Sequence, residues 1–146
     1  MKYSAKNQAN AAAGKAVFVE QHSCGHVLSA WAHFAGEDLC VLLTGGGSPH
    51  VGSASLGIAR KSLKNDGSGS ATVSTLNVTG HKDDVLGNMF AGRLAATLGK
   101  TVCVACGVHF DNATPEELEQ ILRDARVLLE KLEAEIRRRS ALRQSP

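Results

Sequence analysis

Three short polar segments carry most of the side chains that could do chemistry. They are GGGSPH at residues 45–50, GHKDD at residues 80–84 and HFDN at residues 109–112. Glycine lets a backbone approach a ligand closely and adopt positive φ. Lysine adds a cation, and histidine both donates and accepts hydrogen bonds near neutral pH. Such residues suit the binding of an anion or of the polar edge of a cofactor.

The same segments allow a metal centre as an alternative interpretation. His50, His81, His109 and Asp111 are acceptable ligands for zinc or iron. Their spacing matches no HExxH-like motif, so we assign no metal ligand and keep a metal-dependent enzyme as an alternative. No serine or cysteine nucleophile with an adjacent base can be identified from the sequence, so we predict no catalytic residue.

Each segment also has a purely structural interpretation. A glycine run between two strands can be a wide turn, and GGGSPH lacks both the GK[ST] of a P-loop and the following helix of a dinucleotide fingerprint. Asp83 and Asp84 can be N-caps. Asp111 and Asn112 can simply shape the entry into the last helix. Only a common location in space would favour a binding site.

The chain pattern predicts an α+β fold, in which an antiparallel meander sheet is followed by helix, strand and helix. Short apolar or β-branched runs predict the strands, and helical spacing between Asp83 and Gly99 predicts a helix with a C-cap glycine. A capping box with proline at the first helical position opens the last helix. The expected strands cover 16–22, 27–34, 39–44, 51–59, 72–78 and 100–109, and the last helix covers 114–139.

Strand direction brings the three polar segments together. In a meander, the strands ending near Thr44 and near Val78 finish at the same edge of the sheet. A crossover helix normally returns the next strand in parallel, so the strand ending at His109 finishes there too. Both helices begin at this rim, where helix N-termini favour bound anions. We therefore expect one anion-binding rim.

The composition of the chain restricts its expected cellular location and its classes of binding partner. A net charge of +2 and an aromatic content of 4% argue against nucleic-acid and membrane partners. The first residues lack the apolar stretch of a signal peptide, so we expect a reducing cytoplasmic location with free cysteines. Cys103 and Cys106 sit three apart in a predicted strand and point to opposite faces, so they cannot chelate one metal ion.

The expected organisation is a flexible tail at 1–14, a single domain at 15–139 and a C-terminal tail at 140–146. The last helix carries a long apolar stripe. This stripe can be either core packing or a dimer seam. Because the helix is longer than a small sheet needs, its length favours contact of its second half, from about Leu128, with a partner.

Taken together, the segments LLTGGGSPHVGSASLGIAR, TGHKDDVLGNMFAGRLA and VCVACGVHFDNATPEELEQIL resemble the LpdD-like prenylated flavin chaperone family. The resemblance covers roughly residues 27–129, and a triple glycine, an alanine-rich leader and an arginine-ended tail depart from the family pattern. The matching positions are Gly45, Gly46, Pro49, His50, Gly52, Gly80, His81, Lys82, Asp84, His109, Asp111 and Asn112.

The resemblance implies a homodimer with a proteasome assembly chaperone-like fold. It also implies a non-catalytic protein that binds reduced prenylated FMN as cargo and delivers it to a UbiD-type aromatic acid decarboxylase. A ligand-free assembly factor of a decarboxylase complex is the second alternative. Our own assignment of cofactor-binding residues is Gly45, Gly46, Gly47, Ser48, His50, Gly52, His81, Lys82, His109, Asp111 and Asn112.

Overall fold

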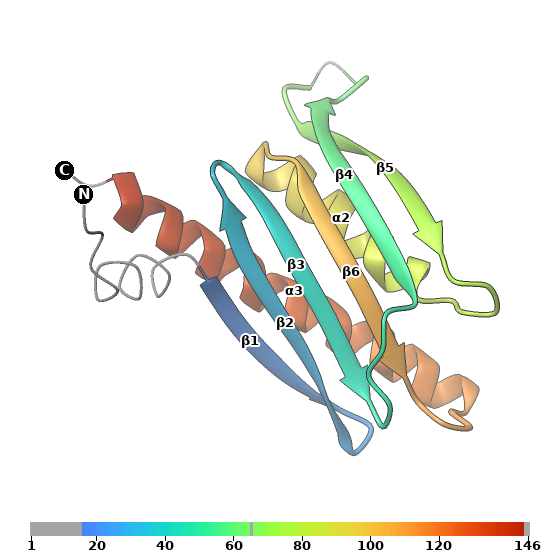
Figure 1. Cartoon of the computed structure of the whole chain (residues 1–146). Coiled ribbons are helices and arrows are strands. Elements are labelled where there is room, and N and C mark those ends of the chain that lie inside the picture. Colours follow the sequence, from blue (N-terminus) through green and yellow to red (C-terminus); the bar gives the residue numbers. More distant parts are fainter. Residues whose placement is uncertain (1–15, 65, 145–146) are drawn as a thin grey trace, which may run out of the picture.

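The computed structural model describes residues 16–64 and 66–144 (Figure 1). The expected tail at 1–14 lies outside this part of the chain. In chain order the elements are β1 (Ala16–Ser23), β2 (His26–Ala35), β3 (Asp38–Gly46), β4 (Ser53–Lys61), β5 (Gly69–Asn77), α2 (Asp84–Leu98), β6 (Val102–His109) and α3 (Pro115–Gln144).

The six strands form one sheet in the order β1-β2-β3-β6-β4-β5. The α+β class, the element order and the long last helix are therefore as predicted. The prediction that the first five strands form a contiguous meander is wrong in one respect, because β6 lies between β3 and β4. It pairs parallel to β3 and antiparallel to β4. The crossover through α2 thus inserts the last strand into the middle of the sheet.

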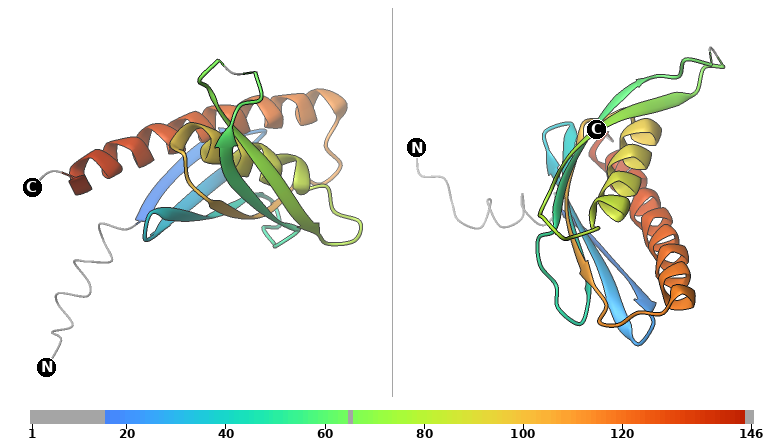
Figure 2. Two further views of the ribbon diagram at one scale, coloured as in Figure 1. Left: turned by 90° about the horizontal axis from the view of Figure 1, so that it is seen from above. Right: turned by 90° about the vertical axis from the view of Figure 1, so that its right-hand side faces the viewer.

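Both helices pack on the same face of the sheet (Figure 2). Helix α2 lies against β4, β5 and β6, whereas α3 lies against β1 and β2. The core between these layers is built from strand residues at alternate positions and from the apolar stripes of both helices. The opposite face of the sheet has no helix over it within the described residues.

The ends of the helices follow the sequence signals. Gly99 takes the left-handed conformation at φ 66° and donates its N–H to Ala95 O at 3.0 Å, as expected of a C-cap glycine. Thr114 and Glu117 form the capping box, with reciprocal bonds of 2.9 and 3.2 Å. The last helix continues past Arg139 to Gln144, so a C-terminal tail starting at residue 140 is wrong.

The second half of α3 packs on its own chain. Leu128, Leu132 and Ile136 are fully buried in the core. The stripe is therefore core packing rather than a dimer seam, because β1 and β2 lie beneath this half of the helix and cover it.

Candidate functional site

The position of β6 determines how the segment between β3 and β4 must run. Because these two strands flank β6, the connection from Gly47 to Gly52 has to pass across the C-terminal part of β6. Gly47 donates its N–H to His109 O at 2.9 Å, and Gly52 donates its N–H to Cys106 O at 2.8 Å. This crossing loop carries His50 over the end of β6.

The start of α2 brings a carboxylate to the same place. Asp83 lies in the N-cap position, but its side chain makes no capping hydrogen bond. Instead Oδ1 accepts the N–H of Val108 in β6 at 2.7 Å. The side chain of Asp83 is only 5% exposed. Asp83 therefore joins α2 to β6, which corrects its interpretation as an N-cap.

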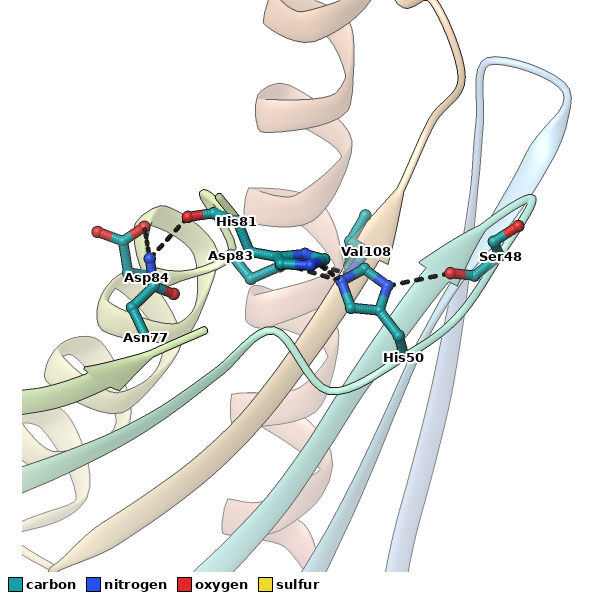
Figure 3. Close-up of polar contacts among 7 residues, drawn as sticks. All are labelled: Ser48, His50, Asn77, His81, Asp83, Asp84 and Val108. Carbon is teal, nitrogen blue, oxygen red and sulfur yellow. Dashed lines mark hydrogen bonds and ion pairs between the residues drawn. The ribbon is translucent and has the colours of Figure 1, made fainter. Parts of the chain in front are cut away.

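His50, His81 and Asp83 converge in one cluster, which we call the His–Asp cluster (Figure 3). His50 Nε2 lies 2.9 Å from His81 Nδ1 and 3.1 Å from Asp83 Oδ2. His81 Nδ1 lies 3.4 Å from Asp83 Oδ2. The three potential ligand atoms therefore lie within 4.8 Å of one another. His50 comes from the crossing loop, His81 from the turn before α2 and Asp83 from the start of α2.

The ring orientation of His50 is set by the crossing loop. Its Nδ1 donates to the backbone carbonyl of Ser48 at 3.0 Å, which leaves Nε2 to face the other two residues. This hydrogen bond, together with the neighbouring Asp83 carboxylate, raises the pKa of His50, although desolvation of the ring opposes the shift. His50 is therefore protonated up to a higher pH than an unperturbed histidine.

Two glycines permit this close packing. A Cβ atom on Gly52 would lie 1.9 Å from Asp83 Oδ2, and a Cβ atom on Gly107 would lie 1.6 Å from His50 O. Real side chains never approach so closely, so both positions require glycine for steric reasons. Gly52 is therefore part of the cluster's packing, as a support for Asp83.

A second polar pair lies next to the cluster. His109 Nε2 lies 2.9 Å from Asp111 Oδ1, so Asp111 does more than shape the entry into the last helix. The rings of His109 and His50 are 6.0 Å apart, between centroids. Asn112 adopts a left-handed conformation with φ 53°, which is the turn that leads into α3. The predicted convergence of His50, His81 and His109 on one rim is confirmed.

A pocket of about 460 Å³ opens beside the cluster, between the starts of the two helices and the end of β6. Its walls are mainly apolar and include side chains of the first turns of α3. Its polar residues come from the turn before α2 and from the end of β6. The lining residues are Gly80, His81, Lys82, Asp83, Val85, Leu86, Val108, His109, Phe110, Leu118, Ile121 and Leu122.

The remaining predicted residues lie away from the pocket lining. Gly45 and Gly46 belong to β3 rather than to a loop, because the strand continues through them. A Cβ on Gly45 would meet Leu28, and one on Gly46 would lie 1.8 Å from His109 O. Packing therefore explains both glycines. Gly47 and Ser48 are exposed in the crossing loop.

The helix N-termini contribute less positive potential than expected. In α3 the Glu117 carboxylate already accepts the N–H of Thr114. In α2 the Asp83 and Asp84 carboxylates lie at the first turn. Acidic groups offset the partial positive charge of a helix start. An anion at this rim has to rely on Lys82 and on charge carried by the His–Asp cluster.

The cysteines take no part in the site. All four are free thiols. Cys103 is exposed and Cys106 is buried, on opposite faces of β6 as predicted. Desolvation raises the pKa of the Cys106 thiol to about 12, so it stays protonated and unreactive.

Sequence reasoning missed two parts of the site. The local pattern predicts Asp83 as a helix cap, and no local signal reveals its bond to Val108, which lies 25 residues away in sequence. Leu118 and Ile121 belong to the apolar stripe of the last helix, which the sequence indicates as packing surface. They line the pocket because they lie in the first two turns of α3, next to Val108, His109 and Phe110.

Comparisons with known proteins agree with this architecture. A family model described as a prenylated flavin chaperone LpdD-like domain matches residues 22–137. Among solved structures, the chain is similar to one described as a novel chaperone complex for yeast 20S proteasome assembly. The TM-score is 0.51 at 14% identity, covering 86% of this chain and 96% of the other, which shows a shared fold. No protein of curated function matches.

Within the described part of the chain, no helix combines the length and the apolarity needed to cross a membrane.

Proposed function

Because the chain belongs to the prenylated flavin chaperone LpdD-like family, we propose that it binds reduced prenylated FMN as cargo and delivers it to a UbiD-type aromatic acid decarboxylase. The observation that carries this proposal is the pocket beside the His–Asp cluster, which combines an apolar wall with a polar, partly cationic mouth. We propose a carrier rather than an enzyme.

The size and lining of the pocket suit such a cargo. Ligand sites for small molecules have volumes of about 300–1,000 Å³ and are mostly apolar with a few polar groups, and this pocket measures about 460 Å³. Leu118, Ile121 and Phe110 offer apolar surface for the prenylated ring system. Lys82 and His109 offer donors for the phosphate or for the polar ring edge.

The pocket is also open enough for release. Leu118 is 52% exposed and Val85 is 54% exposed, so part of the wall remains accessible from outside. The buried Cys106 thiol is no candidate for covalent capture. Tight but reversible binding is what transfer to another protein requires, and an open, non-covalent pocket supports it.

We further propose that the chain acts as a homodimer through the face of the sheet that the helices leave uncovered. Register partners place one apolar row across all six strands of this face. Several of its members are large and exposed, which marks an interaction surface rather than scattered single residues. The row consists of Phe18, Trp31, Leu42, Ala105, Ala54 and Leu76.

A second copy is the occupant that this face fits best. The row is uncharged, and a twofold axis would bring it against itself, as symmetric dimer interfaces require. The rings of Phe18 and Trp31 are in contact, with centroids 4.3 Å apart and planes tilted by 42°, which gives the row an aromatic end. Action in the cytoplasm is consistent with four free thiols.

Delivery can be tested with a variant that fills the pocket. Leu118→Trp places a bulky ring on the exposed wall, so we expect at least a tenfold lower yield of active decarboxylase when the loaded protein is mixed anaerobically with apo-decarboxylase. Val127→Trp is the matched control, because Val127 is exposed on the same helix but lies outside the pocket lining. The readout is decarboxylation of an aromatic acid after removal of free cofactor.

This experiment distinguishes a cofactor carrier from a ligand-free assembly factor. If Leu118→Trp and Val127→Trp both activate the apo-decarboxylase as well as the unmodified protein does, the pocket does not hold the cargo. If activation proceeds equally with protein that was never loaded, the assembly-factor alternative replaces our proposal.

A further inference from the structure

We propose that the His–Asp cluster binds one divalent transition-metal ion through His50 Nε2, His81 Nδ1 and Asp83 Oδ2. Two histidines and one carboxylate on one side of an ion form a facial triad, a known ligand set for divalent first-row metals. This goes beyond the proposed function, and it departs from the sequence analysis, which assigned no metal ligand.

The spacing of the three atoms fits a common ion. Metal–nitrogen and metal–oxygen bonds of about 2.0–2.2 Å, at angles between octahedral and tetrahedral, separate neighbouring ligand atoms by roughly 3.0–3.5 Å. The observed separations are 2.9, 3.1 and 3.4 Å. Little movement is needed to admit the ion. His109 and Asp111 pair with each other and stand outside this set.

The outer contacts of the cluster are those of a metal site. A metal-binding histidine usually donates its second ring N–H to a carbonyl or carboxylate, which fixes its tautomer. His50 does so through Nδ1 to Ser48 O. A ligating carboxylate is usually held by a hydrogen bond as well, and Asp83 Oδ1 accepts the N–H of Val108. Both ligands are therefore oriented before any ion binds.

Electrostatics favour a cation at this point. Asp83 is 95% buried as a side chain, and a buried carboxylate needs a partner charge. With Nδ1 of His50 donating to Ser48 O, Nε2 of the neutral ring presents a lone pair to the Asp83 carboxylate. Two lone pairs at this distance repel unless a proton or a cation lies beside them. A metal ion would bind the lone pair of His50 Nε2 and the Asp83 carboxylate at the same time.

The ion would also resolve a conflict within the proposed function. His81 and Asp83 line the pocket, so the free coordination positions of the ion would face it. An anionic cargo would be repelled by the Asp83 carboxylate, whereas a bound dication reverses the local charge. This last step rests on the proposed function, and it assigns an anionic oxygen of the cargo as a further metal ligand.

The metal titration that tests the site contains no flavin. Protein stripped with a chelator and dialysed is titrated with Zn²⁺ in a calorimeter, and we expect one ion per chain. Asp83→Asn should weaken binding at least tenfold, because the amide keeps an oxygen for the Val108 N–H but loses the charge. His50→Ala and His81→Ala should each do the same. Circular dichroism melting checks that each variant is folded.

His33→Ala is the control. His33 lies in β2, where it pairs with Ala16 and Cys40 at the opposite end of the sheet from the cluster. Zn²⁺ binding should be unchanged in this variant. The proposal is overturned if the unmodified protein binds no Zn²⁺, or if the folded Asp83→Asn, His50→Ala and His81→Ala variants bind as it does. Failure here leaves the carrier function standing, because cargo binding is measured separately.

Discussion

Gly52→Ala is expected to destroy the His–Asp cluster and to destabilise the protein by about 1–3 kcal/mol, the range for overpacking a well-packed site. The added Cβ would lie 1.9 Å from Asp83 Oδ2, 2.6 Å from Asp83 Cγ and 3.0 Å from His50 Nε2. Gly52 itself is buried and is fixed by its N–H bond to Cys106 O. The Asp83 side chain would have to move.

Movement of Asp83 has two consequences. The N–H of Val108 loses its acceptor, which adds the cost of an unpaired backbone group in a partly buried position. The distances among His50, His81 and Asp83 also change. We therefore expect a lower denaturation midpoint in urea and at least a tenfold loss of cargo retention after desalting.

Gly47→Ala is the matched control in the same loop. The nearest atom to its Cβ would be His26 Cε1 at 3.5 Å, an ordinary van der Waals contact. We expect a change within about 0.5 kcal/mol in stability, as for most surface substitutions. Equal unfolding midpoints and equal cargo retention for Gly52→Ala and Gly47→Ala would show that the crossing loop does not support the cluster.

Trp31→Glu is expected to convert the proposed homodimer into a monomer. Trp31 stands in the apolar row of the open sheet face between Phe18 and Leu42, its register partners on the two neighbouring strands. In a twofold interface the substitution introduces two carboxylates, and burying unpaired charges costs several kcal/mol. Because a buried aromatic often dominates interface energy, we expect a shift of at least a hundredfold in the dissociation constant.

The measurement is molar mass by light scattering during size-exclusion chromatography over a range of concentrations. Val127→Glu, an apolar-to-acid change on the exposed side of α3, should leave the mass unchanged. A monomeric unmodified protein, or a dimer that survives Trp31→Glu, would contradict the assignment of this face.

The sequence predicted the elements well because their signals are local. Gly99 and the Thr114–Glu117 box marked helix ends through backbone chemistry that the structure reproduces. Strand direction could also be predicted, because each short turn reverses the chain and the one crossover helix returns the next strand in parallel. That is why His50, His81 and His109 could be placed on one rim.

Strand order could not be obtained in this way. Insertion of β6 between β3 and β4 depends on how strongly the apolar run Val102, Val104 and Cys106 prefers the middle of the sheet, where both neighbours pair with it. This is a property of long-range packing rather than of any turn. The insertion forces the crossing loop over β6, which is what brings His50 to Asp83.

The role of Asp83 was hidden for a related reason. An aspartate before a helix is usually a cap, and the local pattern favours that interpretation. The N–H of Val108, which Asp83 accepts instead, is 25 residues away in sequence. Gly52 is required by the same long-range contact. Such pairs appear only when the sheet order is known.

Native mass spectrometry after anaerobic incubation with reduced prenylated FMN tests the central claim most directly, namely that this pocket holds the cargo without a covalent bond. We predict one added cofactor mass per chain, retained through desalting by the unmodified protein and lost on denaturation. In Leu118→Trp this mass should be absent under the same conditions. A spectrum of intact, folded protein without any cofactor mass, or with equal occupancy in Leu118→Trp, would contradict the account.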